Sequence, residues 1–407
     1  MSTLKLVNLQ HQSSNTPALV LDANNLVTVT GNLNVSNSLV VTGNTIFSGS
    51  VNFNTDIVPT SSFKRNRIIN GNMAVDQRNA GAAITANTGA AFTVDRWSFS
   101  SSQASKFTVQ QNAGSVTTPV GFPNYLGMTV ASAVTVGSSD IFSLYQPIEG
   151  YNFADLGFGT YNAKTVTLSF IVYSSLTGTF GGTLKNYAST RTYAFTYSIS
   201  SANTWTTVSV TIPGDTSGTW VGSSSAGVAY VQFGLGVGST YSGTAGSWAS
   251  ANYCSATGAV SVVGTAGATW YVTGVQLEVG AKATPYEYQT YGEQLAQCQR
   301  YYVQWTGNSS GTGYAFISNA VVQGSGTFFT TISLPVSMRS TPSISTNGTI
   351  TGGPNAGTLS TITTIYTQQG STLGVYGTIS VTGTTGYAFV FYTYNASTSY
   401  FALSSEI

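Results

Sequence analysis

Apolar residues recur at every second position over long parts of this chain, which is the spacing that β-strands show. The pattern is longest from Val27 to Phe53, where nine of the fourteen odd positions are Val, Leu or Phe. This segment also repeats itself, since Val29-Thr30-Gly31-Asn32 returns as Val41-Thr42-Gly43-Asn44. Repeats this short cannot bury an apolar face alone. Residues 27–63 are therefore predicted to form a trimeric β-repeat shaft with a core shared between chains; two hairpins packed on a neighbouring domain are the alternative.

The alternation continues through residues 64–290. It covers residues 166–172, 193–199, 208–212, 231–237 and 270–279. Turn signals such as Pro213-Gly214-Asp215 separate the strands. In the last stretch the apolar parity changes across Gly274, which predicts a β-bulge. We expect one large domain here, a β-sandwich or jelly roll.

One helix is predicted, at residues 291–303, as a link to the last domain. One face of it would be formed by Tyr291, Leu295, Cys298 and Tyr302. Residues 304–407 are again rich in β-type patterns, and Phe389 and Phe391 alternate near the end. They predict a C-terminal β-sandwich tip in which inner aromatic side chains pack on a trimer axis. The fold class expected for the whole chain is all-β.

Charge is scarce: 6% of the 407 residues are charged and the net charge is +1, whereas roughly 25% is typical of globular domains. Aromatic residues reach 12%, which argues against disorder. Every apolar run is too short for a membrane helix of about 18 residues, so no membrane insertion is expected. The only basic cluster, Lys64, Arg65 and Arg67, is interpreted as a solvated hinge, and no nucleic-acid partner is expected.

Segments at both ends of the middle domain carry a family resemblance. Asn66 to Met73, Asp76-Gln77-Arg78 and Thr93 to Trp97 resemble the start of a domain found in many phage tail-fibre and virion structural proteins. Trp270 to Gly280 resembles its closing strand, and Glu293 to Tyr302 resembles the segment after it. That domain is similar to the jelly-roll carbohydrate-binding modules of glycoside hydrolases. The resemblance implies attachment and a location on the virion, in a tail or capsid appendage, and leaves the ligand open.

The resemblance also implies roles for single residues. Asn70, Gly71 and Asn72 would start the first strand, and Trp97 would lie in the core. Some related modules hold a structural calcium, and no other cofactor is expected. Candidate ligands for it here are Asp76, Asp95 and Glu278. Calcium needs six or more oxygen ligands, and no Asp-x-Asp loop accompanies these residues.

Catalysis is not expected. The single histidine, His11, lies in the N-terminal arm, far from any partner for a catalytic triad. Cys254 and Cys298 have no metal-ligand spacing and are predicted to be buried thiols. Glycosidases need only two carboxyl groups, and the candidates for such a pair are Asp140, Glu149 and Asp155. They fall on separate predicted turns, which favours solvated loop carboxylates.

Binding chemistry is better supplied. Sugars present flat C–H faces that stack on aromatic rings, and hydroxyls that pair with amides and hydroxyls. Aromatic residues in or beside predicted loops, or in the tip, are the candidates: Trp205, Trp220, Tyr241, Trp248, Tyr253, Tyr392, Tyr394 and Tyr400. Core packing is the favoured alternative for each, and we expect one or two of them to reach solvent.

The primary hypothesis is a homotrimeric phage tail fibre that binds host-surface glycans through many weak contacts, made effective by multivalency. Residues 1–26 would attach it to another virion protein. One alternative is a capsid-bound head fibre or decoration protein without a ligand. The other is a polysaccharide depolymerase, which the missing long right-handed helix repeat argues against.

Overall fold

The computed structural model describes residues 64–307, 315–324, 326–348, 350–353, 359–365, 370, 372–379, 385–386, 388–393 and 399–407, and three short strands before them. Those strands, β1 (Asn8–Leu9), β2 (Leu19–Leu21) and β3 (Val27–Val29), form one antiparallel sheet within a first unit, residues 1–57. The predicted shaft and attachment segment otherwise lie outside the described residues, as does His11.

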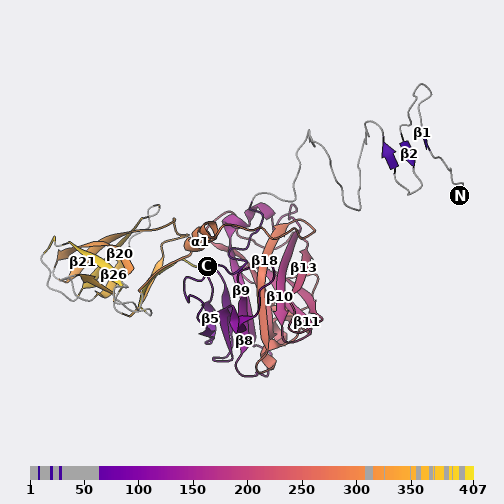
Figure 1. The fold of residues 1–407 in the computed structure, drawn as a ribbon, viewed down its shortest axis with the longest axis horizontal. Helices are drawn as coiled ribbons and strands as arrows, with labels where there is room; N and C mark the ends of the chain where they lie inside the picture. Colours follow the sequence, from indigo (N-terminus) through magenta and orange to yellow (C-terminus); the bar gives the residue numbers. More distant parts are fainter. Residues whose placement is uncertain are drawn as a thin grey trace. The chain divides into compact units, whose positions relative to one another are not determined.

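Two antiparallel sheets form the middle of the chain (Figure 1). The six-stranded sheet has the order β13 (Thr206–Ile212), β10 (Val166–Ser174), β18 (Thr269–Val279), β8 (Leu126–Val130), β7 (Phe107–Gln111) and β4 (Ile84–Thr85). The seven-stranded sheet has the order β16 (Trp248–Ala249), β12 (Thr192–Ile199), β11 (Gly178–Asn186), β14 (Gly227–Val237), β9 (Ile141–Glu149), β6 (Ser98–Ser101) and β5 (Gly89–Phe92). This arrangement is the all-β sandwich that the alternation predicts.

The alternating apolar side chains of both sheets meet in one core. Phe170 of β10 contacts Phe233 of β14, with ring centroids 5.0 Å apart. The indole Nε1 of Trp270 donates to the hydroxyl of Tyr197 at 3.0 Å, so this polar edge is satisfied inside the core. Trp97 is fully buried, which confirms its predicted position. The apolar side chains that alternate along the strands thus form the core of the sandwich.

The bulge predicted at Gly274 is present. Gly274 has a φ of +62°, and the register of β10 against β18 shifts opposite it. A Cβ atom at this position would lie 2.9 Å from the ring of Phe122. Glycine is therefore required both by the backbone conformation and by the close approach of that ring.

The predicted first strand at Asn70, Gly71 and Asn72 is wrong, because these residues form a turn and β4 is the first strand of the sandwich. Asn70 adopts a φ of +57°, and its side-chain amide donates to the carbonyls of Val75 and Asp95. The bond to Val75 is local, and bonds of this kind stabilise a turn in place of a strand. The turn still lies against β18, since the carbonyl of Gly71 accepts from the amide of Val275 at 2.9 Å.

The linking helix α1 spans Tyr291–Gln299, shorter than the predicted 291–303. Thr290 and Glu293 form a capping box at its start. Cys298 is buried, but Tyr291 is 60% exposed, so the expected single face holds only in part. Short 3₁₀ turns occur at Ala113–Ser115, Gly150–Asn152, Ala154–Leu156, Ser239–Tyr241 and Val262–Gly264. Two short parallel strands, β15 (Ser242–Gly243) and β17 (Ser255–Ala256), complete the middle region.

The C-terminal part is a smaller two-sheet structure. One sheet has the order β19 (Tyr302–Thr306), β27 (Tyr400–Ser404) and β22 (Ser343–Asn347). The other has the order β23 (Ile350–Gly353), β26 (Ala388–Thr393), β20 (Ala315–Gly324), β21 (Thr327–Ser333), β25 (Thr372–Ile379) and β24 (Leu359–Ile365). Phe389 and Phe391, predicted to pack on a trimer axis, are instead buried in the core between these sheets. Their own chain covers them, so they require no neighbouring copy.

Both cysteines are free and buried, as predicted. Among the residues that the structure describes, none of the helices has the length and apolar character needed to cross a membrane.

Candidate functional site

The outer face of the seven-stranded sheet carries a polar pocket. Side chains alternate along each strand, so Leu144 and Val231 enter the core while Tyr145 and Tyr230 point to the other face. The pocket has a volume of about 180 Å³. We call it the lysine pocket, and its lining residues are Ser100, Ile141, Tyr145, Lys185, Ser189, Tyr230, Gln232, Asn252 and Cys254. None of them is a candidate from the sequence analysis.

One wall of the lysine pocket is the segment that contains Asn252, Cys254 and Ser255, which passes over the sheet in close contact with it. A Cβ atom on Gly181 or on Gly234 would lie 2.5 Å from the side chain of Ser255. Glycine at these two outward positions therefore lets the segment approach the backbone of β11 and β14 closely. The approach brings Asn252 and Cys254 to the edge of the pocket.

Tyrosine rings form another side of the pocket. Tyr145 meets Tyr230 edge to face, with ring centroids 5.6 Å apart. Tyr187, which is 39% exposed, stacks on Tyr230 with ring centroids 5.0 Å apart. Burial raises the pKa of the Tyr145 and Tyr230 hydroxyls above the usual value for tyrosine. The hydroxyl of Tyr145 is hydrogen-bonded with Ser98 and that of Tyr230 with Tyr187.

Lys185 is the charged residue of the pocket and is only 7% exposed. Its Nζ donates to Asn252 Oδ1 at 3.1 Å and to Cys254 Sγ at 3.6 Å, and it lies 5.5 Å from the ring centroid of Tyr230. No carboxylate in the described part of the chain forms an ion pair with it. Its neighbours are thus an amide oxygen, a thiol and an aromatic ring.

Two of the predicted aromatic candidates lie together but in a packed cluster. Trp220 stacks on Phe153 at 5.7 Å and meets Trp248 edge to face at 5.7 Å. Their indole nitrogens donate to Asp215 Oδ2 and to the carbonyl of Pro213. Both side chains are half-buried, so this cluster mainly holds loops onto the sandwich.

The other predicted aromatic residues are scattered. Trp205 packs against Tyr125 and Tyr173, beside the six-stranded sheet, and its indole donates to the carbonyl of Thr117. The remaining described candidates are half-buried: Tyr241, Tyr253, Tyr392 and Tyr400. Tyr394 lies outside the described residues. The structure therefore does not gather the predicted set into one site.

Each of the three candidate catalytic carboxylates has a contact of its own. Asp140 accepts from the amide of Gly137 at 2.9 Å. Glu149 is paired with Arg300 at 2.5 Å, and Asp155 with Arg67 at 2.8 Å. Glycoside hydrolysis requires two carboxyl groups facing one bond, whereas each of these three is engaged by a donor of its own.

The candidate calcium ligands do not fit a calcium site. The carboxylate of Asp76 accepts hydrogen bonds from the backbone amides of Asn79 and Gly81. The carboxylate of Asp95 accepts from Gln77. The carboxylate of Glu278 accepts from Thr284. Amide and hydroxyl donors thus occupy the oxygens that a cation would need. No group of three or more acidic, cysteine or histidine side chains in the described residues could hold a metal ion.

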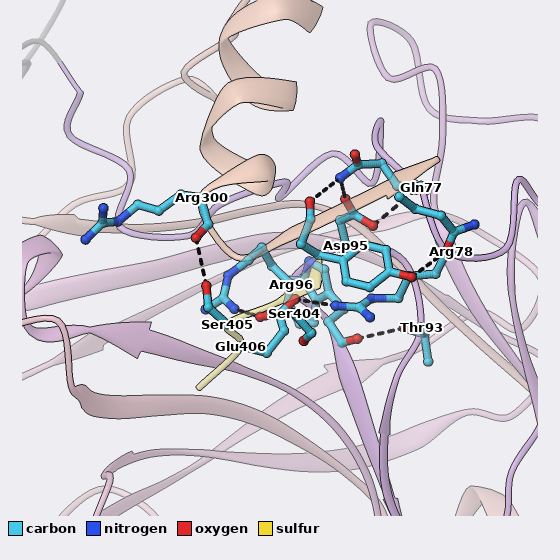
Figure 2. Close-up of polar contacts among 12 residues, drawn as sticks. Gln77, Arg78, Thr93, Asp95, Arg96, Arg300, Ser404, Ser405 and Glu406 are labelled. Atoms are coloured by element: carbon cyan, nitrogen blue, oxygen red, sulfur yellow. Dashed lines mark hydrogen bonds and ion pairs between the residues drawn. The ribbon is translucent and has the colours of Figure 1, made fainter. Parts of the chain in front are cut away.

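A second buried charged cluster surrounds Glu406, just after β27 (Figure 2). Its carboxylate lies between the guanidinium groups of Arg78, at 2.7 Å, and Arg96. Arg96 lies over the ring of Tyr301, and Arg78 over the ring of Tyr302. Both arginines come from the segments that carry the family resemblance. We call this group the Glu406 cluster.

The backbone around Glu406 is held as firmly as its side chain. Arg339 donates to the carbonyls of Ser405 and Glu406, at 2.7 and 2.9 Å, and to the carbonyl of Ser225. Asp95 is buried beside the cluster and bonded to Gln77, and burial raises its pKa to about 7. The motif residues of the jelly roll therefore fasten the segment after β27 to the sandwich.

Comparisons with known proteins give only structural similarities. No family model matches this sequence, and no curated protein matches it significantly. Similar solved structures include the enzymatically active domain of tailspike protein 4 from bacteriophage CBA120, with 12% identity, a TM-score of 0.28, and 53% of this chain and 21% of that chain covered. A CBM4 structure matches with 16% identity, a TM-score of 0.25, and coverage of 52% and 98%. A family 11 carbohydrate-binding module from Clostridium thermocellum matches with 12% identity, a TM-score of 0.24, and coverage of 49% and 100%.

Proposed function

We propose that this chain is the subunit of a virion fibre that attaches to a host surface by binding glycans in the lysine pocket. The observation that carries the proposal is the combination of two tyrosine rings, Tyr145 and Tyr230, with amide and hydroxyl groups in one pocket. Small-ligand sites are commonly concave, with apolar or aromatic walls and a few placed polar groups.

The groups of the pocket match the two surfaces of a sugar. Tyr230 and Tyr145 supply apolar ring area for C–H faces. Asn252 and Gln232 add amides, and an amide both donates and accepts. A sugar hydroxyl also donates and accepts, so the amides that line the pocket suit it chemically.

Assembly into a homotrimer with residues 1–26 docked on another virion protein is part of the proposal. The outer face of the C-terminal six-stranded sheet presents apolar residues: Phe316 is 67% exposed, and Val321 and Val390 are exposed on the same face. An apolar patch of this kind is typical of an interface. Three copies would present three pockets, so weak single contacts would add up to firm attachment.

Binding without catalysis fits the carboxylates. Glu149 and Asp155 are each engaged by an arginine, and Asp140 by a backbone amide. None of the three lines the lysine pocket. We therefore propose that the chain is not an enzyme and that the depolymerase alternative does not apply.

The test is a glycan array with the full chain and the variant Tyr230→Ala. We expect wild-type binding to fall about tenfold or more in the variant, or about 1.4 kcal/mol, because the ring area is lost. Tyr161→Ala is the matched control, since Tyr161 is 90% exposed and outside the pocket. Tyr230→Phe keeps the ring and guards against a folding defect.

Two outcomes would contradict the proposal. If the wild-type chain binds no glycan on a broad array, the virion decoration without a ligand becomes the better explanation. If Tyr230→Ala binds as tightly as Tyr161→Ala, glycans bind elsewhere on the molecule. Native mass spectrometry tests the assembly separately, and a stable monomer would contradict the trimer.

A further inference from the structure

Lys185 stands out among the buried charges of the molecule. In the described part of the chain, the buried basic residues are Arg96 and Lys185. Arg96 has the carboxylate of Glu406 as its partner. Lys185 has neutral hydrogen-bond partners and an aromatic ring instead. Because moving a charge out of water costs free energy unless it is paired, this position is unfavourable for a purely structural residue.

The neutral partners leave capacity on the ammonium group. An ammonium has three N–H donors, and one of them goes to Asn252 Oδ1 while another meets Cys254 Sγ, a weak acceptor. Lys185 also lines the lysine pocket itself. Its charge therefore faces a space where a ligand group with a negative charge can complete its coordination.

The rest of the pocket is free of acidic groups. Its other lining residues are hydroxyl, amide, thiol and apolar side chains. An anionic ligand would thus meet one positive charge and no repulsion from the wall. A charged hydrogen bond is roughly twice as strong as a neutral one, so this single contact would dominate the choice between acidic and neutral sugars.

We propose that the lysine pocket selects an anionic saccharide, one that carries a carboxylate or a sulfate, and that Lys185 is the residue that determines this specificity. The inference rests on the proposed glycan binding and names its substrate class. The anionic group accepts a hydrogen bond from Nζ of Lys185, while Tyr230 packs on the sugar ring and Asn252 meets a hydroxyl.

The experiment uses an array on which uronic-acid glycans are printed beside the same glycans with their carboxylates reduced to alcohols, together with sulfated and unsulfated pairs. We expect the full-length wild-type chain to bind the acidic member of a pair about tenfold more tightly than the neutral one. The carboxylate and sulfate pairs show which anion is selected. Raising the salt concentration should reduce the preference.

Variants assign the preference to Lys185. Lys185→Gln should bind the acidic and the neutral glycan of a pair equally, with the affinity for the neutral glycan unchanged. Lys185→Arg should retain much of the preference for the acidic glycan. Lys282→Gln is the matched control, because Lys282 is exposed and outside the pocket. Thermal unfolding of each variant shows that the fold is retained.

The outcomes separate this inference from the proposed function. Equal binding of acidic and neutral members by the wild-type chain would overturn the anionic ligand and leave glycan binding intact. A preference that survives in Lys185→Gln would overturn the role of Lys185. Binding to no glycan at all would overturn the proposed function, and the inference with it.

Discussion

The Glu406 cluster and the lysine pocket place positive charge inside the protein in opposite ways. In the cluster, the guanidinium groups of Arg78 and Arg96 enclose a carboxylate and lie on aromatic rings. In the pocket, Lys185 meets an amide oxygen, a thiol and a ring. A buried charge with its counter-charge ties the chain together, whereas a buried charge without one is better explained by a ligand.

The scarcity of charge makes this comparison informative. From Trp305 to Ile407 the sequence contains two charged residues, Arg339 and Glu406. Both act at the same place, where Arg339 binds the backbone carbonyls of residues 405 and 406 and Glu406 binds the arginines of the jelly roll. The C-terminal part thus uses its few charges to fasten β27 to the middle domain.

The largest expected effect is the loss of stability on Glu406→Gln. This change leaves the buried guanidinium group of Arg96 and the half-buried one of Arg78 without their shared carboxylate. Removing one member of a buried pair typically costs about 3–5 kcal/mol. Denaturant unfolding of the full chain measures it. The control is Asp155→Asn, since Asp155 is half exposed and its pair with Arg67 should contribute at most about 1 kcal/mol. Equal effects of the two variants would contradict a structural role for the cluster.

The next effect is a pH dependence caused by Asp95. Burial, opposed by hydrogen bonds from Gln77, raises the pKa of Asp95 to about 7 in the folded chain, above the 3.8 of an unperturbed aspartate. The folded state therefore binds this proton more tightly than the unfolded state. The stabilisation that results from protonated Asp95 is complete below about pH 4 and is lost as the pH rises through about 7.

Comparison with Asp95→Asn isolates this effect, because an amide does not titrate. Between pH 4 and pH 8, the stability of the wild type relative to the variant should fall by about 2–4 kcal/mol. Denaturant unfolding at a series of pH values measures the difference. A difference that stays constant, or that rises with pH, would show that Asp95 is ionised in the folded chain.

Much of the sandwich could be predicted from the sequence, because its strands bury one face each. The alternation around Phe170 and Phe233 is sufficient to place both strands, and the parity change at Gly274 is sufficient to place the bulge. The helix is predicted from the spacing of its apolar residues, although its end at Gln299 is not. The turn at Asn70 is stabilised by a side-chain hydrogen bond, which the alternation of apolar residues does not reveal.

The sites were less predictable, because their residues come from strands whose order in the sheet differs from their order in the sequence. The lysine pocket joins residues of β6, β9, β11 and β14 with a loop, and these strands are neighbours in space but not in sequence. A signal existed in the polar residues Gln232 and Lys185, which occupy outward positions of β14 and β11. Tryptophans in or beside predicted loops indicated the binding site less well. Trp220 and Trp248 instead donate hydrogen bonds to other groups of the protein and pack on each other.

The smallest expected effect on stability is that of Lys185→Met, and it sharpens the comparison most. If the charge of Lys185 serves a ligand, its removal in the absence of glycan should change the free energy of unfolding by less than about 1 kcal/mol, or raise it, because an apolar side chain of similar length suits a buried position. Arg96→Met is the matched variant at the paired site and should lose roughly 3–5 kcal/mol, since Glu406 then stays buried with Arg78 alone. Denaturant unfolding of both variants measures the contrast. A large loss in Lys185→Met would mean that Asn252, Cys254 and Tyr230 stabilise the ammonium group well enough for a structural role, and the two buried charges would then differ in partners but not in purpose.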